Sequence, residues 1–522
     1  MRRRDFVTAG ALVGALPDLT RGGPRPGVSP HNWDGYDFGP VPRVPDRLDQ
    51  GPFSIDQDQG WFTIEMTSPS RERVGNWGLG LVGYTWEENG PSLAARGRTS
   101  TLEREVEKLA SLPFVDLLYI RCDWRDVQSR PGRLDFSPVW GLTLDAARRH
   151  GLRVGFRIQM SNPEIQPARL AIPDFLREKV PVSRIGRIRR GEEFDAVEPH
   201  YHHPEFQRAF RELNELLAVA LDSNPSVEFA DLMMYGFWGE GHTSNLSHSF
   251  PDAPTAERTF LEMTRFQMET WKRAPLAVNT QPDISGVGND AVLELAVRGG
   301  CWLRSDSIVL EEPIQIEELS GRPPWLAVVM EDGTHRHHRM DSERFTVDAA
   351  GINVIEKAML HALDLRANYW ALWTEADNLA RYHERYPDGI TALQRRLGYR
   401  VRPSWTWQRK RNGTAELVIA FANDGVAGVP GVLRVHVESL DGKVRVGGGL
   451  DAGHPYGGRL RQASFLLPPG MDGQSIVIKG EVEGRGGVRR PVRWACAQPT
   501  NKDGSLTVRL KRHDDADWRK GI

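Results

Sequence analysis

Two glutamates of this 522-residue chain follow apolar stretches that have the character of buried strands. Glu240 comes after the run 231–237, with a tryptophan and a glycine between the run and the carboxylate. Glu331 directly follows the run 325–330. A carboxyl group donates a proton when it is protonated, and it attacks or accepts a proton when it is ionised. The two residues are therefore candidates for paired acid/base and nucleophilic work, provided that the fold brings them together.

The elements that must position these carboxylates follow a repeating order of apolar strand and charged amphipathic helix, from about residue 75 to residue 399. Eight such units in succession predict a (β/α)8 TIM barrel rather than an open, doubly wound sheet. Gly78, Gly80 and Gly83 lie inside the first strand and open no helix, so they do not form a phosphate-binding turn. The predicted strands are 77–85, 115–122, 152–160, 229–237, 276–280, 301–305, 326–330 and 369–374.

The pattern changes after Pro403, where helical periodicity ends and short alternating runs are separated by Gly, Asp and Pro. This pattern predicts a small all-β antiparallel sandwich after the barrel. The segment before the barrel, about residues 21–51, is rich in Pro and Gly and is typical of a linker or an extended arm. The predicted domains are a twin-arginine (Tat) signal at 1–20, an N-terminal extended arm or linker at 21–74, the catalytic barrel at 75–403 and the sandwich at 404–522.

The first residues carry arginines, a phenylalanine and a short apolar stretch that ends at Leu16. This order predicts a Tat export signal and a periplasmic or secreted protein. The apolar stretch is too short to span a bilayer, and we expect no membrane span elsewhere. Lys and Arg number 67 against 69 Asp and Glu, which argues against a nucleic-acid binder. Three cysteines without a CxxC motif predict neither a disulfide framework nor a Cys-based zinc site.

In a TIM barrel, residues just past the carboxyl ends of the strands gather around one pocket. Those positions carry carboxylates, amides, arginines and indoles. Such a mixture suits a carbohydrate, because its hydroxyls need polar partners and its C–H faces pack on aromatic rings. The predicted substrate-binding residues are Arg121, Asp123, Trp124, Arg157, Gln159, Asn162, Trp238, His242, Asn279, Arg304, Asp306, Trp373 and Glu375.

Glycoside cleavage needs a protonated acid at the leaving oxygen and a carboxylate at the anomeric carbon. Strands four and seven lie on opposite sides of a barrel, so Glu240 and Glu331 can face each other across its mouth. We assign Glu240 as the acid/base and expect Trp238 and His242 to raise its pKa by desolvation or to tune it by hydrogen bonding. We assign Glu331 as the nucleophile, held ionised by Arg304 or Arg157. Asp306 and Glu375 compete for that role.

The segments 118–127 and 131–136, with the helix that ends at His150 and Gly151, resemble the β-galactosidase-like retaining glycoside hydrolases of the large TIM-barrel clan. They are also similar to uncharacterised bacterial barrels related to that clan. In these proteins a strand ending in Arg-x-x-Trp precedes a Pro-Gly turn and a helix ending in His-Gly. The run 236–240 looks like the strand-four acid/base motif, and Glu331 matches the strand-seven nucleophile position.

The resemblance covers residues 75–399 and implies a glycosidase without an organic cofactor. We expect a retaining mechanism if the two carboxyl groups lie about 5–5.5 Å apart, whereas a spacing of roughly 6.5–9.5 Å would indicate inversion. This chain departs from it at Gly239, where many members of the clan have an Asn that contacts the substrate 2-hydroxyl.

Three alternatives stay open. A non-catalytic carbohydrate-binding barrel would keep the tryptophans but would need neither glutamate. A metal-dependent hydrolase would use the histidines, although neither histidine cluster has HExxH spacing, so we expect these residues to wall the pocket and expect no metal site. The basic stretch 184–190 is expected to be a solvated loop, with contact to an acidic polysaccharide as its functional alternative. The histidine clusters are His200, His202 and His203, and His335, His337 and His338.

Overall fold

The computed structural model describes residues 60–85, 101–162, 170–190, 192–243, 246–280, 289–305, 313–331, 354–372, 376–385, 387–411 and 413–512. Eight parallel strands close into a barrel, which confirms the predicted TIM fold. Each strand pairs with the next one along the chain, and the last pairs with the first. The barrel strands are β2 (Gly80–Tyr84), β3 (Leu117–Asp123), β4 (Arg153–Gln159), β7 (Val227–Asp231), β8 (Leu276–Asn279), β9 (Trp302–Ser305), β10 (Val328–Glu331) and β11 (Tyr369–Leu372).

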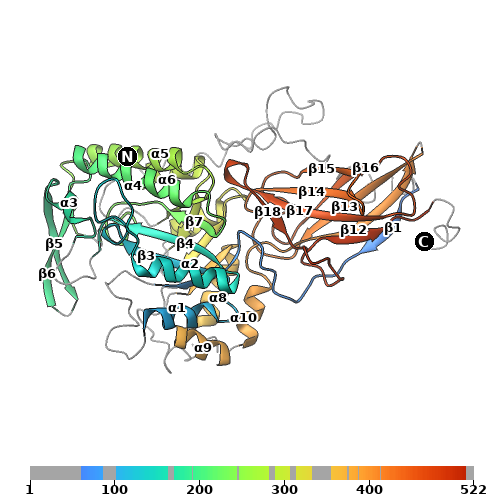
Figure 1. Cartoon of the computed structure of the whole chain (residues 1–522), viewed down its shortest axis with the longest axis horizontal. Coiled ribbons are helices and arrows are strands. Elements are labelled where there is room, and N and C mark those ends of the chain that lie inside the picture. The colour runs from blue at the N-terminus through green and yellow to red at the C-terminus, as the bar shows by residue number, and fades with distance from the viewer. Residues whose placement is uncertain are drawn as a thin grey trace.

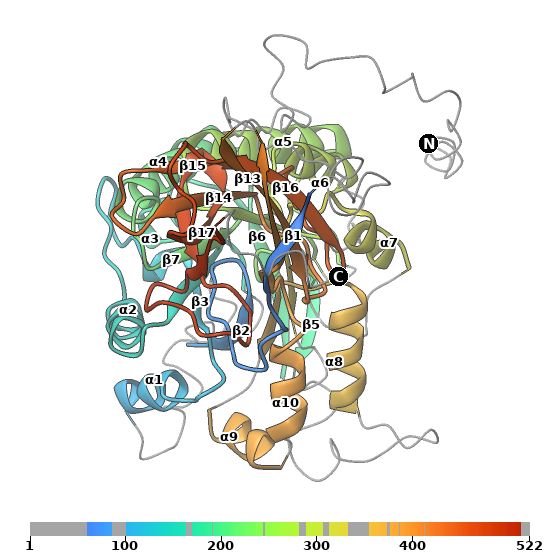
Figure 2. The ribbon, with the colours of Figure 1, turned by 90° about the vertical axis from the view of Figure 1, so that its right-hand side faces the viewer.

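Helices surround this barrel, as Figure 2 shows from the end of the molecule that carries the sandwich. Their ends follow local chemistry. Thr101 caps α1 by accepting the N–H of Arg104, and α2 ends at Gly151, whose φ of 66° is left-handed. The helices are α1 (Leu102–Ala110), α2 (Pro138–His150), α4 (Pro204–Leu221), α5 (Ala253–Thr270), α6 (Asn289–Arg298), α7 (Pro313–Gly321), α8 (Val354–Asp364), α9 (Ala376–Arg385) and α10 (Pro387–Gln394).

Two apolar layers hold the barrel together. The outward side chains of the strands pack under the helices in one continuous core. The inward side chains are large, and rings such as those of Tyr119, Phe229, Trp302 and Tyr369 fill the interior. The barrel is therefore a packed core, and its chemistry is confined to the ends of its strands.

The C-terminal region is a two-sheet antiparallel sandwich, as predicted. Its core contains Leu417, Phe421, Leu433 and Ile478, which come from both sheets. One sheet contains β1 (Phe62–Met66), β12 (Val401–Arg411), β13 (Thr414–Asn423) and β16 (Leu460–Leu466). The other contains β14 (Val432–Ser439), β15 (Arg445–Gly449), β17 (Ser475–Glu483), β18 (Arg489–Val492) and β19 (Leu506–Arg509).

Two strands of the sandwich begin before residue 404, the predicted start of this domain. β1 comes from the segment expected to be an arm, yet it pairs with β12 as an edge strand of the sandwich. β12 begins at Val401, three residues before the expected boundary at 404. Pairing partners far apart in the sequence explain the first difference, because a lone five-residue strand carries no local signal of the sheet it joins.

Two differences affect the barrel mouth. β7 ends at Asp231, whereas the strand was predicted to run to Phe237. The basic stretch 184–190, expected to be a solvated loop, belongs to a strand, because the segment 161–203 contains the short helix α3 (Asp174–Arg177) and an antiparallel hairpin. That hairpin is formed by β5 (Val182–Arg190) and β6 (Glu192–Pro199), and in Figure 1 it lies at the far side of the barrel from the sandwich.

The two ends of the barrel therefore differ in what covers them. The sandwich packs at the amino-terminal ends of the strands, where its loop at Gly484 and Arg485 meets the start of β7. The carboxyl ends face the other way, toward the β5–β6 hairpin. Among the described residues, no helix is both long and apolar enough to cross a bilayer.

Candidate active site

The loop after β7 directs Glu240 into the barrel mouth through a tight turn. At Gly236 φ is 76°, and a Cβ there would lie 1.9 Å from the carbonyl oxygen of His242. Trp238 has a φ of 57°, a left-handed conformation that costs a bulky residue about 1–2 kcal/mol. Only glycine fits the first position, and the second stores strain. The apolar run therefore leaves the sheet at Asp231 and doubles back instead of continuing as a strand.

Glu240 is buried and meets three basic side chains. Arg157 donates from Nη1 to Oε1 at 2.8 Å, and Nη2 of Arg121 lies 3.1 Å from the same oxygen. His242 holds the other oxygen, with Nε2 at 3.0 Å from Oε2. Both oxygens are therefore fixed in orientation.

Glu331, the last residue of β10, is equally buried and equally held. Its Oε2 accepts hydrogen bonds from Arg304 Nη2 at 2.7 Å and from the Tyr84 hydroxyl at 2.8 Å. Its Oε1 lies 3.5 Å from Nη1 of Arg121. The guanidinium of Arg121 thus contacts both glutamates, so the structure brings the two carboxylates together across the mouth.

A third carboxylate, Asp231, completes the network and was missed in the sequence because it was placed inside a longer strand. Its Oδ2 accepts hydrogen bonds from Arg157 Nε at 2.9 Å and from the Tyr119 hydroxyl at 2.5 Å. Nε of Arg304 lies 3.3 Å from the same oxygen. Three arginines and three carboxylates therefore alternate in the mouth, and each buried charge has an opposite charge beside it, as burial requires.

This network sets the protonation of Glu240: of the two expected effects, hydrogen bonding by His242 acts on its pKa, and desolvation does not prevail. Burial raises its pKa, but Arg121, the hydrogen bond from His242 and Arg157 together outweigh burial and lower the pKa to about 2. The carboxyl of Glu240 is therefore ionised near neutral pH. The cations beside the carboxyl thus decide the outcome against burial.

A second polar cluster supports the same loop. Asp123, at the end of β3, accepts hydrogen bonds from Gln159 Nε2 at 2.7 Å and from Asn162 Nδ2 at 3.1 Å. A Cβ built on Gly239 would lie 3.6 Å from Gln159, so the cluster packs directly under the turn. Asn279 is buried at the end of β8, in register with Arg304 of β9.

One predicted substrate contact is contradicted by the structure. Trp124 is fully buried away from the mouth, edge-on to Phe206 of α4 at 5.7 Å, and its Nε1 donates to Gln128 at 2.8 Å. It lies in a 3-10 turn directly after β3, and this turn directs its ring toward the helix layer. Asp306, Trp373 and Glu375 lie outside the described residues, as do the histidines at 335, 337 and 338.

The remaining histidines have local structural partners. The rings of His200 and His202 stack with centroids 5.4 Å apart, and His203 caps α4 by accepting the N–H of Glu205. Within the described ranges, no group of three or more His, Cys, Asp or Glu side chains is arranged to hold a metal ion.

Two tyrosines of the site were not predicted. Tyr84 and Tyr119 come from β2 and β3, and their rings pack 4.9 Å apart inside the barrel. Burial raises the pKa of both hydroxyls, so they remain hydrogen-bond donors to the carboxylates at neutral pH. The position of Tyr84 at the predicted carboxyl end of the first strand was the available signal for it.

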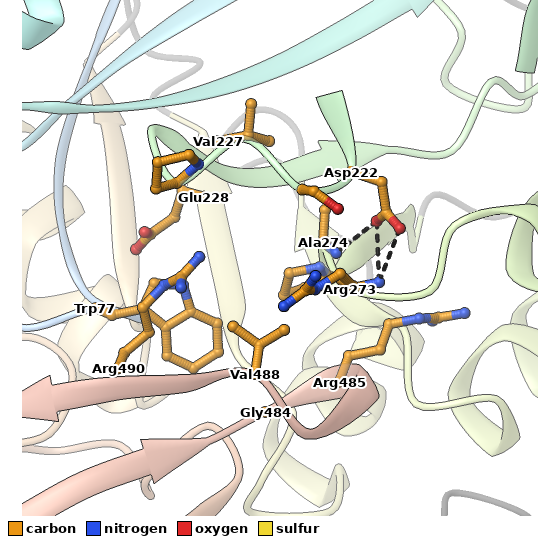
Figure 3. Close-up of a pocket in the computed structure, with 13 residues that line it drawn as sticks. Trp77, Asp222, Val227, Glu228, Arg273, Ala274, Gly484, Arg485, Val488 and Arg490 are labelled. Atoms are coloured by element: carbon orange, nitrogen blue, oxygen red, sulfur yellow. Dashed lines mark hydrogen bonds between the residues drawn. The ribbon is translucent and has the colours of Figure 1, made fainter. Parts of the chain in front are cut away.

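A hollow lies at the amino-terminal end of the barrel, opposite the candidate site (Figure 3). Its Glu228 is buried and bound to Arg153, Tyr369 and the N–H of Gly78. Asp222 accepts the backbone N–H groups of Arg273 and Ala274, as the dashed lines in the figure show. Both carboxylates are thus engaged in joining the barrel to its connecting loops.

Comparison with known proteins finds distant similarity to solved structures. No family model matches the sequence, and no curated protein does. Endo-glycoceramidase II from Rhodococcus sp., solved as a lactosyl-enzyme intermediate, is similar at 12% identity and a TM-score of 0.37, over 77% of this chain and 99% of that one. The catalytic domain of β-amylase from Paenibacillus polymyxa is similar at 8% identity and a TM-score of 0.37, over 57% of this chain and 93% of that one. β-Galactosidase from the psychrophilic Marinomonas ef1 is similar at 10% identity and a TM-score of 0.35, over 60% of this chain and 61% of that one.

These similarities are to glycoside hydrolases, the class that the sequence resembles.

Proposed function

We propose that this chain is a glycoside hydrolase that cleaves an oligo- or polysaccharide by a retaining, two-carboxylate mechanism. One observation carries the proposal: Glu240 and Glu331 come from opposite sides of the barrel and both contact Arg121 in its mouth. Carboxylates that face each other at the carboxyl ends of barrel strands are what glycosidic cleavage requires.

Glu331 is the nucleophile in this proposal. Arg304 and Tyr84 both bind its Oε2, which fixes the carboxylate in orientation and favours its ionised form. Oε1 faces Arg121 at the longer distance of 3.5 Å and is the oxygen that would attack the anomeric carbon.

Glu240 is the acid/base, and its lowered pKa means that it must receive a proton before it can give one. His242, with Nε2 at 3.0 Å from Oε2, is the neighbour that can share a proton with it. A sugar that enters the mouth and displaces Arg121 would also remove one cause of the lowered pKa. Protonation of the Glu240–His242 pair is then the step that prepares the leaving group.

The test is a screen of the purified protein on aryl glycosides and on plant, algal and bacterial polysaccharides, followed by Glu240→Gln and Glu331→Gln. An acid is needed only by a poor leaving group. Glu240→Gln should therefore keep fast release of dinitrophenolate from a dinitrophenyl glycoside, seen as a pre-steady-state burst, while losing turnover of natural linkages. Hydrolysis of the glycosyl-enzyme should be slow in this variant, because Glu240 is also the base of the second step. Glu331→Gln should lose both, because no covalent intermediate forms. Equal residual activity of both variants on both kinds of substrate would refute the assignment.

A second candidate function is a non-catalytic carbohydrate-binding barrel. The observation that favours it is the pairing of Glu240 with Arg121 and Arg157, which lowers its pKa and suits a fixed binding network better than a proton donor. The binding protein is the correct assignment if the parent chain binds glycans without cleaving them and both glutamine variants bind equally well.

We also propose export through the twin-arginine pathway, which rests on the N-terminal sequence alone. Replacing Arg2, Arg3 and Arg4 by Lys should retain the protein inside the cell. Unchanged export would refute this proposal.

A further inference from the structure

Glu198, the next-to-last residue of the hairpin strand β6, buries its carboxyl behind the loop that carries Glu240. Its side chain is fully inaccessible, and neither oxygen forms a hydrogen bond of ordinary geometry with the described residues. The hydroxyls of Ser161 and Tyr201 lie near enough to lower its pKa slightly, but burial dominates and raises it to about 8. In the part of the chain that the structure describes, no cation shifts the pKa of this carboxyl, in contrast to Glu240. Glu198 is therefore a neutral carboxylic acid at neutral pH.

The two residues beside Glu198 are the ones that hold the turn before Glu240. The Tyr201 hydroxyl accepts the backbone N–H of Gly236 at 3.2 Å. The Ser161 carbonyl accepts the N–H of Trp238 at 3.0 Å. Gly236 and Trp238 are both in left-handed conformations, so these two bonds support the part of the loop that is most strained.

The hairpin also packs against the same turn. Ile185 and Ala196 pack with Phe237 and Trp238 in a small apolar cluster of their own. The β6 end is tied down where the Ser249 hydroxyl donates to the carbonyl of Pro199 at 2.6 Å. The carboxyl of Glu198 thus sits where the hairpin, the end of β4 and the loop after β7 meet.

We propose that Glu198 is a positioning residue: in its neutral form it keeps Ser161 and Tyr201 against the 236–240 loop and so holds Glu240 in the barrel mouth. Ionisation would place an unpaired charge in this sealed contact and push the hairpin and the loop apart. The effect on the loop follows from the geometry, whereas the effect on catalysis rests on the proposed function.

Three titratable groups around Glu198 do not change charge near pH 8, namely Tyr201, His200 and His202. Burial raises the pKa of Tyr201, and Glu198 and Tyr235 raise it further, so its hydroxyl stays protonated well above pH 8. Burial lowers the pKa of His200, which contacts Ser183 opposite Glu198, and that of His202, so both are neutral there. His203 stands at the start of α4, and on the outer face of the hairpin Asp195 pairs with Arg184 and Arg187.

The test compares wild type, Glu198→Gln and Glu198→Ala, with Asp195→Asn on the exposed side of the same hairpin as the matched control. Hydrogen exchange of the peptide that contains Gly236 and Trp238 is followed from roughly pH 6.5 to 9.5 and corrected for the intrinsic rate. Protection in wild type should fall about tenfold or more as the pH rises through 8, as should that of the control, while Glu198→Gln stays protected. Glu198→Ala should lose protection at every pH.

Identical exchange of wild type and Glu198→Gln across this range would overturn the proposal, and that comparison remains decisive if the alanine variant does not fold. The activity measurement adds a second readout: kcat of wild type should fall above pH 8 and that of Glu198→Gln should not. If no glycoside is cleaved at all, the proposed function fails, but the exchange experiment still decides the role of Glu198.

Discussion

Replacing Glu240 by Gln tests the electrostatics of the mouth directly, because it removes one negative charge and keeps the shape of the side chain. The pKa of Glu240 falls from 4.5 to about 2 in the folded protein. At about 1.4 kcal/mol per pKa unit, this corresponds to about 3 kcal/mol of folding stability at pH 7. Glu240→Gln should therefore be less stable than wild type by roughly that amount at neutral pH, since Arg121 and Arg157 each lose one of their two carboxylate partners.

The sign of the pH dependence follows from the lowered pKa. A carboxyl whose folded pKa is depressed contributes its stability above its unfolded pKa and loses it as the pH falls toward the folded value. The difference between wild type and Glu240→Gln should therefore shrink from about 3 kcal/mol at pH 7 to about 1 kcal/mol near pH 3.

Urea unfolding at both pH values measures this difference, and Glu262→Gln on the exposed face of α5 is the control, for which no difference is expected. A gap for Glu240→Gln that is the same at pH 7 and pH 3, or no gap at all, would refute the reasoning that the arginines hold Glu240 ionised.

Three further predictions concern the neighbours of the two glutamates. Tyr84→Phe removes the hydrogen bond of 2.8 Å from the tyrosine hydroxyl to Glu331. Because a hydrogen bond to a charged group contributes about 1.5–3 kcal/mol, steady-state kinetics should show kcat lower by about tenfold or more. An unchanged kcat would show that the hydroxyl does not support Glu331 in catalysis. Gly236→Ala should lower the free energy of unfolding by well over the ~1 kcal/mol of left-handed strain, because its Cβ would lie 1.9 Å from a carbonyl oxygen. Gly239→Ala, whose Cβ would have no atom nearer than 3.6 Å, should lower it only by that strain. Thermal unfolding of both variants measures this, and equal losses would contradict the turn geometry. Arg121→Met leaves two buried carboxylates with one cation fewer, so thermal unfolding should show a loss of about 3–5 kcal/mol, and a variant as stable as wild type would show that Arg121 does not bridge them.

Much of the fold could be predicted from the sequence, because strand and helix periodicities are local. The strand predicted at 276–280 is β8 (Leu276–Asn279) in the structure, and Gly151 ends its helix as expected. The run 229–237 was predicted as one strand and ends at Asp231. Buried apolar residues look alike whether they continue a ladder or pack in a turn, and the close approach of Gly236 to His242 is not visible in the sequence.

The candidate site was only partly predictable for a similar reason. Glu240 and Glu331 were found because each follows an apolar run, and a closed barrel brings strand ends together. Trp124 was placed wrongly, since one short turn decides which layer its ring enters. Asp231 and Glu198 were missed because their importance comes from partners far away in the chain.

The sequence by itself determined the architecture, the order of strands around the barrel and the two glutamates at its mouth, because hydrophobic periodicity and strand order are properties of the linear chain. The tertiary structure alone decided the charge state of those glutamates. A pKa depends on the groups within a few ångströms in space, and the arginines that hold Glu240 ionised come from β3 and β4. It likewise decided that Glu198 is neutral, because that carboxyl is sealed where segments from three separate parts of the chain meet.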